Sequence, residues 1–146
     1  MKYIFYTLLS LFILTACKTS KNYLERSDSD NTLFDAVKAL KKRSSDTAAL
    51  NALPVLYPLA QQRHLKKINS YSSSNEITRW DKIIDSYSNL QQMYDAINEV
   101  SAAASVVTPV NYQQTIYDLK QQAAEDYYTT ANDYLNKPGR DDAKKA

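Results

Sequence analysis

Apolar side chains recur at spacings of three and four residues along most of the chain, which is the period of one face of an α-helix. The first such stripe predicts a helix over residues 31–43. Asp30 or Asn31 can cap its start, and the basic residues at its end suit the negative pole of the helix dipole. Its expected buried positions are Leu33, Phe34, Val37 and Leu40.

A second helix is expected from Asp46, a good N-cap, to about Asn69. Pro54 and Pro58 lie inside this segment, and each removes a backbone donor. We therefore expect the helix to be kinked or split near residues 53–57. Its apolar positions are Leu50, Leu53, Leu56, Tyr57, Ala60, Leu65 and Ile68.

A third, longer helix is predicted from Ser74 or Asn75 to Ser105, because its apolar positions follow the helical period without a break. At 1.5 Å per residue it would span roughly 45 Å. Such a seam suits packing in an antiparallel bundle. The seam comprises Trp80, Ile83, Tyr87, Leu90, Tyr94, Ile97, Ser101 and Ala104.

A fourth helix is predicted with Thr108 as its N-cap and Pro109 as its first residue, ending at about Asn136. Pro138 and Gly139 would stop it, and residues 138–146 then form a turn with an incomplete helix or tail. Its expected buried positions are Tyr112, Ile116, Leu119, Ala123, Tyr127, Ala131 and Tyr134.

The turn-forming residues support a helical fold. The 146 residues include one glycine and four prolines, too few for the tight turns of β-hairpins. The predicted fold class is therefore all-α, with long helices in antiparallel hairpins or a bundle over residues 31–137.

One internal pattern resembles the tetratricopeptide repeat, W-x2-L-G-x2-Y, then A-x3-F, then P. It depends on Trp80, Ile83, Ile84, Tyr87, Ala96, Val100, Ala103 and Pro109. Ile84 occupies the glycine position, and Val100 replaces the phenylalanine. Moving 34 residues forward from Trp80 and Tyr87 leads to Gln114 and Gln121, so no second repeat follows at the expected period. The resemblance implies a helical hairpin, or the first part of a helical-repeat array, and we prefer the long-helix bundle.

The N-terminus has the order of a secretory signal. A positive charge at Lys2 precedes an uncharged apolar run over residues 3–14, which is shorter than the roughly 20 residues of a spanning helix. The run ends in Leu14-Thr15-Ala16-Cys17, which resembles the lipobox of bacterial lipoproteins. The alternative is an N-terminal membrane anchor.

The lipobox resemblance implies a signal peptide over residues 1–16, cut between Ala16 and Cys17. It also implies a lipid on the Cys17 thiol, and more than one acyl chain gives stable anchoring to a membrane. Cys17 is the only cysteine, so the mature chain has no internal disulfide and no other thiol for chemistry. Residues 17–30 are then a lipidated cysteine and a polar tether.

The same resemblance implies the bacterial cell envelope as the location. In the enterobacterial sorting pattern an aspartate after the lipidated cysteine retains the protein at the inner membrane, and this chain has Lys18 there. We therefore expect the outer membrane, with the domain facing the periplasm. The cell surface is the alternative.

The composition holds few residues for chemistry. His64 is the only histidine, and no metal ligand lies three or four residues from it, so we expect no metal site and place it at the surface or boundary of the helix. One glycine is too few for a phosphate-binding loop. A net charge of +2 gives no sign of nucleic-acid binding. We predict no cofactor and no catalytic residue.

Tyrosine is unusually abundant, with 12 in the chain. Tyr87, Tyr94 and Tyr127 lie on predicted buried seams and are expected in the core. Tyr117 and Tyr128 lie off those seams and are the candidates for partner binding, because tyrosine offers contact area with a polar tip.

These observations favour a non-enzymatic function. We expect a membrane-anchored envelope lipoprotein whose helical domain binds a protein partner or scaffolds a complex. One alternative is an enzyme or a glycan-binding accessory lipoprotein with an unrecognised site. Another is an envelope-organising lipoprotein that contacts lipid or cell wall.

Overall fold

The computed structural model describes residues 22–136, which form an all-α bundle with no strand within that range, as predicted. The predicted signal peptide, Ala16 and Cys17 lie outside the described residues, as does the predicted C-terminal turn or tail from residue 138 on. The elements are the 3-10 helix η2 (Tyr23–Glu25) and the α-helices α2 (Ser29–Lys42), α3 (Thr47–Ser72), α4 (Arg79–Glu99), α5 (Ser101–Ala104) and α6 (Gln113–Leu135).

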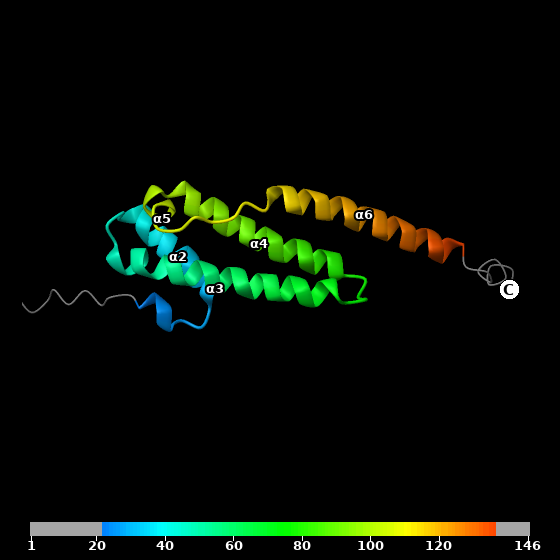
Figure 1. The fold of residues 1–146 in the computed structure, drawn as a ribbon, viewed down its shortest axis with the longest axis horizontal. Helices are drawn as coiled ribbons and strands as arrows, with labels where there is room; N and C mark the ends of the chain where they lie inside the picture. The colour runs from blue at the N-terminus through cyan, green and yellow to red at the C-terminus, as the bar shows by residue number, and fades with distance from the viewer. Residues whose placement is uncertain (1–21, 137–146) are drawn as a thin grey trace, which may run out of the picture.

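Helices α3 and α4 form the central antiparallel hairpin, with α2 packed on α3 and α6 packed on α4 (Figure 1). The core lies between them, and its largest fully buried side chains include Leu33, Leu53, Leu90, Met93 and Ile97. None of the helices within residues 22–136 is both long enough and apolar enough to cross a membrane.

Helix α2 starts slightly before the predicted helix because Asp28 is its N-cap. The Asp28 carboxylate accepts hydrogen bonds from the backbone N–H groups of Asp30 and Asn31 at 3.1 and 3.3 Å. These hydrogen bonds hold the pKa of Asp28 below its ordinary value of 3.8. The hydrogen bond from the Asn31 N–H has the largest effect. Asp30, one of the two predicted caps, is thereby free to point toward α3.

Helix α3 is continuous from Thr47 to Ser72, so the expected split at the prolines is wrong. Pro54 and Pro58 are four residues apart, and both are exposed. Each proline lacks an N–H group, so the backbone carbonyls of Leu50 and Pro54 lose their helical hydrogen-bond donors. These carbonyls lie on the outer face of the helix. Water can satisfy carbonyls there, and the buried face continues undisturbed through Leu53, Leu56, Tyr57 and Ala60.

The predicted long third helix is shorter at both ends. It begins at Arg79 rather than Ser74 or Asn75, and it ends at Glu99, where Val100 takes an extended conformation. After the break, Val100, Ala103 and Val107 are buried in the core. Val100 lies at the break itself, Ala103 lies on the short helix α5, and Val107 lies in the segment after it.

The predicted seam of α4 is therefore only partly correct. Ser101 is exposed and Ala104 is half-buried, and both lie on α5. Trp80, Tyr87 and Tyr94 are half-buried rather than fully buried. The residues of α4 that are fully buried are Ile83, Ser86, Leu90, Met93 and Ile97. Because α4 runs unbroken through Ala96, the tetratricopeptide-like residues from Trp80 to Ala96 lie on one helix.

The fourth helix begins at Gln113, not at Pro109, because other contacts hold the segment before it. The Val110 N–H donates to the Tyr57 hydroxyl at 2.8 Å, and the Tyr112 N–H donates to Gln91 Oε1 at 2.7 Å. Residues 107–112 thus cross the α3–α4 hairpin in an irregular conformation before α6 starts.

Candidate interaction surface

Among the described helices, α6 packs on α4 alone, along one of its faces. Its contacts are with α4, against which Ile116 and Leu119 are half-buried and Ala123 is buried. Ahead of the helix, the Tyr112 ring packs on Tyr87 with 5.3 Å between ring centroids.

The prediction of a buried seam along the whole of α6 is wrong beyond Ala123. Tyr127 is 36% exposed, and Ala131 and Tyr134 are exposed as well. The C-terminal end of α6 extends past the turn between α3 and α4 (Figure 1), so none of the described helices lies beneath it.

Asp126 holds α6 to the start of α4. Its Oδ2 atom accepts hydrogen bonds from Arg79 Nη2 and from the indole Nε1 of Trp80, each at 2.8 Å. Burial, with the nearby negative charge of Asp81, raises the pKa of Tyr127 above 10.0. These are the last contacts that join α6 to α4 before the helix projects.

The opposite side of α6 carries an uninterrupted exposed stripe, which we call the outer seam. Its members alternate at spacings of four and three residues, the period of a heptad. Tyr117 is 58% exposed, Tyr128 72% and Leu135 62%. The full outer seam is Tyr117, Gln121, Ala124, Tyr128, Ala131 and Leu135, all exposed.

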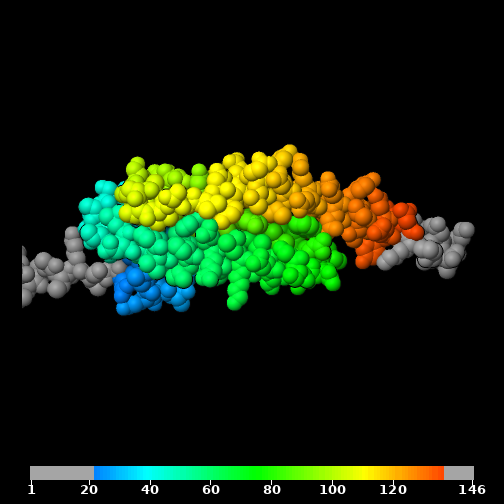
Figure 2. Space-filling model, viewed as in Figure 1, coloured from blue at the N-terminus to red at the C-terminus, as the bar shows by residue number. Residues whose placement is uncertain are grey.

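The sequence-based prediction of Tyr117 and Tyr128 as exposed residues is confirmed. The other members of the outer seam were missed. Their signal is present in the sequence, since Gln121, Ala124 and Leu135 follow the same four-three spacing on the side away from α4. In Figure 2, α6 forms a ridge along one side of the bundle, with its end projecting beyond it.

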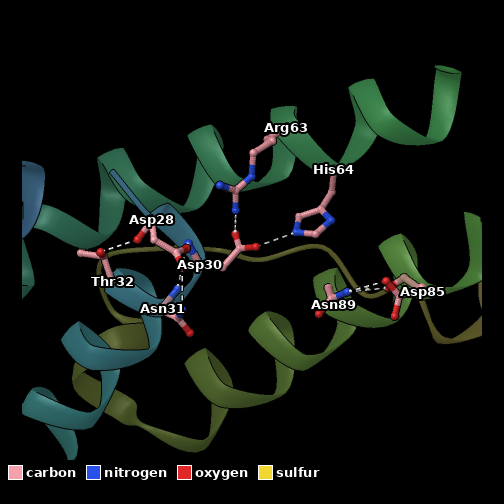
Figure 3. Close-up of polar contacts among 8 residues, drawn as sticks. All are labelled: Asp28, Asp30, Asn31, Thr32, Arg63, His64, Asp85 and Asn89. Atoms are coloured by element: carbon pink, nitrogen blue, oxygen red, sulfur yellow. Dashed lines mark hydrogen bonds and ion pairs between the residues drawn. The ribbon is translucent and has the colours of Figure 1, made fainter. Parts of the chain in front are cut away.

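The surface or boundary position predicted for His64 is wrong, because the residue is only 3% exposed. Its Nε2 atom lies 3.0 Å from Asp30 Oδ2, and the other carboxylate oxygen, Oδ1, forms an ion pair with Arg63 (Figure 3). A carboxylate oxygen only accepts, so Nε2 of His64 carries the proton in this contact. The cluster joins the first turn of α2 to the middle of α3.

We interpret the cluster of Asp30, Arg63 and His64 as structural. It acts as a clamp because its contacts tie the first turn of α2 to α3. Within residues 22–136, Arg63 Nε and His64 Nδ1 are buried without a hydrogen-bond partner. Within residues 22–136, no group of three or more histidine, cysteine, aspartate or glutamate side chains is arranged to hold a metal ion.

Among the hollows of the described surface, two border α3. One, of about 380 Å³, lies between α3, α4 and α6 and has Arg79, Trp80 and Tyr87 among its lining residues. The other, of about 640 Å³, follows the outer face of α3 and includes Arg63 and Lys66 among its lining residues.

The comparisons with protein-family models, with curated proteins and with solved structures gave no match to this chain.

Proposed function

We propose that the chain is a lipid-anchored protein of the bacterial envelope, whose helical domain binds a protein partner through α6 and catalyses no reaction. The observation that carries the proposal is the outer seam, in which exposed tyrosines lie on a helix attached by its other face. Isolated exposed apolar residues are ordinary, whereas a continuous stripe on a projecting helix is typical of helix-in-groove or helix-to-helix recognition.

The anchor follows from Leu14-Thr15-Ala16-Cys17. Tyr23, which is buried in the domain, lies six positions after Cys17, so covalent geometry keeps the domain within roughly 20 Å of the lipid. The blue start of the described chain and the end of α6 lie toward opposite ends of the long axis (Figure 1). The free end of α6 can therefore reach away from the membrane.

Photo-crosslinking tests the binding surface. A photoreactive amino acid in place of Tyr128 should give a reproducible adduct in intact cells, because that position lies at the centre of the exposed stripe. The matched control is the same amino acid at Thr129, which is exposed on α6 but lies off the outer seam. Equal labelling from both positions, or no adduct from either, would reject α6 as the binding surface.

The anchor has its own test. Cys17→Ser should abolish lipid labelling and release the protein from membranes. Full retention of the variant in the membrane fraction would overturn the lipoprotein part of the proposal without bearing on α6.

A second candidate function rests on the hollow beside Trp80 and Tyr87. Aromatic rings at a pocket wall suit a sugar ring, so the domain would be a glycan-binding accessory lipoprotein. Trp80 is the only tryptophan, so its fluorescence reports on this hollow. A saturable change with cell-wall oligosaccharides that Tyr87→Ala removes would support this function, and no change at millimolar glycan would reject it.

A further inference from the structure

The outer seam has the layout of one strand of a coiled coil. A heptad has two core positions. The first is occupied here by Gln121, Tyr128 and Leu135, and the second by Tyr117, Ala124 and Ala131. The small alanines let a facing helix approach closely, and the larger tyrosines fill the space beside them.

The residues that flank the outer seam differ in charge. Lys120 lies on one side, and Asp118 and Glu125 lie on the other, all three exposed. Neither Lys120 nor Glu125 forms an ion pair within residues 22–136. The structure therefore leaves one positive and one negative flank available to a partner helix.

The positions of the charged residues that flank the outer seam suit pairing with a second α6 helix that runs in the same direction. In a parallel pair, the residue before each first core position faces the partner's residue five positions further along the chain. Lys120 would then face Glu125 of a second copy, and two-fold symmetry makes this contact twice. An antiparallel pair would instead bring the acidic flanks, Asp118 and Glu125, against each other.

We infer that the partner of the outer seam is a second copy of this chain, with the two α6 helices packed in parallel through Tyr117, Ala124, Tyr128 and Leu135. This inference rests on the proposed role of α6 as the binding surface and names its occupant. The face of α6 that packs on α4 lies opposite the outer seam, so the two bundles lie on opposite sides of the paired helices.

The pairing is expected to depend on the membrane. Six seam positions on each copy make a small contact, and interfaces below about 1,200 Å² are typical of weak association. Two chains anchored at Cys17 in one membrane face the same way and meet at a raised effective concentration. Parallel helices fit this arrangement, because both chains extend from the same surface.

Disulfide trapping tests the orientation. In the parallel pair Ala131 faces Ala131 of the second copy, so Ala131→Cys in the otherwise unchanged chain should give a covalent dimer in the oxidising envelope. Thr129→Cys is the matched control and should give at least roughly tenfold less dimer, because two cysteines more than about 7 Å apart between Cα atoms do not bridge. The chain without an added cysteine shows how much covalent dimer forms through Cys17 alone.

Charge reversal tests the register. Lys120→Glu should lower the yield of the Ala131→Cys dimer by roughly tenfold, since it replaces two attractive contacts with repulsive ones. Adding Glu125→Lys should restore the yield. The two positions are five residues apart and form no pair within one helix, so rescue reports contact between copies.

The outcomes separate this inference from the proposed function. An adduct from Tyr128 with a different protein, and no dimer from Ala131→Cys, would overturn self-pairing and leave α6 as a binding surface. A Tyr128 adduct of twice the chain mass without the Ala131→Cys disulfide would overturn the parallel orientation. No adduct from Tyr128 together with no disulfide would overturn both.

Discussion

The indole N–H of Trp80 donates a hydrogen bond of 2.8 Å to the carboxylate of Asp126, which ties the first turn of α4 to the middle of α6. Arg79 donates to the same oxygen atom at 2.8 Å. Ala123 is the last buried residue of α6, and this contact anchors the helix just beyond it, where its C-terminal turns begin to project.

Asp126→Ala should therefore loosen the distal part of α6 while leaving the bundle folded. Hydrogen bonds to charged groups contribute about 1.5–3 kcal/mol, and partial exposure of both partners reduces this to about 1 kcal/mol here. We expect faster amide hydrogen exchange over residues 124–135 and unchanged protection of α3. Asp133→Ala, an exposed position on the same helix, is the control. Equal exchange in the two variants would contradict the role assigned to Asp126.

The clamp between α2 and α3 gives a second prediction. Asp30→Ala removes the ion-pair partner of Arg63, whose side chain is 37% exposed, and leaves the buried His64 without its acceptor. A buried donor without an acceptor costs about 1–3 kcal/mol, so the free energy of unfolding should fall by about 2 kcal/mol in urea titration.

Asp35→Ala is the matched control for Asp30, since Asp35 on α2 pairs with Arg26 in an exposed contact. Exposed ion pairs contribute at most about 1 kcal/mol. If the two variants lose the same stability, the Asp30 cluster is not the clamp that its burial indicates.

Much of the fold follows from local signals. The stripe of Leu33, Val37 and Leu40 predicts α2, and Asp46 predicts the start of α3, because amphipathic spacing and capping act within a few residues. Exposure of Tyr117 and Tyr128 follows from the same spacing.

The structure differs from the sequence-based prediction where residues distant in the sequence determine the local conformation. Thr108 and Pro109 are good helix-start residues, yet hydrogen bonds from Val110 to Tyr57 and from Tyr112 to Gln91 hold this segment irregular. Those partners are 53 and 21 residues away, beyond the reach of any sequence window. The burial of His64 beside Asp30 escaped prediction for the same reason.

The N-cap of α3, Asp46, makes the stability of the fold depend on pH. Asp46 accepts a hydrogen bond from the Ala49 N–H at 3.2 Å, and this bond, followed by the contact with Arg43, holds the pKa of Asp46 below 3.8. A pKa that is lower in the folded state means that the ionised carboxylate stabilises the fold above about pH 4. This contribution is lost as the pH falls through the lowered pKa.

Asp46→Ala should lower the free energy of unfolding by about 1 kcal/mol at neutral pH, which is the usual effect of removing an N-cap. The deficit relative to the wild type should shrink below pH 4, where the wild-type carboxylate is protonated. Asp46→Asn keeps a capping oxygen and should recover most of the stability at pH 7. Thermal unfolding across pH 3–7 measures both effects, and a deficit that does not change with pH would refute the assignment.

The hydroxyl of Tyr57 holds the segment that leads into α6, and Tyr57→Phe tests this contact. Burial raises the pKa of Tyr57 above 10.0, so the hydroxyl is neutral at physiological pH and accepts from the Val110 N–H at 2.8 Å. Removing it leaves that N–H without its acceptor, at a cost of about 1–2 kcal/mol. We expect faster hydrogen exchange at Val110 and a small loss of stability. Tyr71→Phe is the control, because the Tyr71 hydroxyl makes no hydrogen bond within residues 22–136. If exchange at Val110 is unchanged in Tyr57→Phe, the segment is held by packing of Val107 and the hydroxyl contributes little.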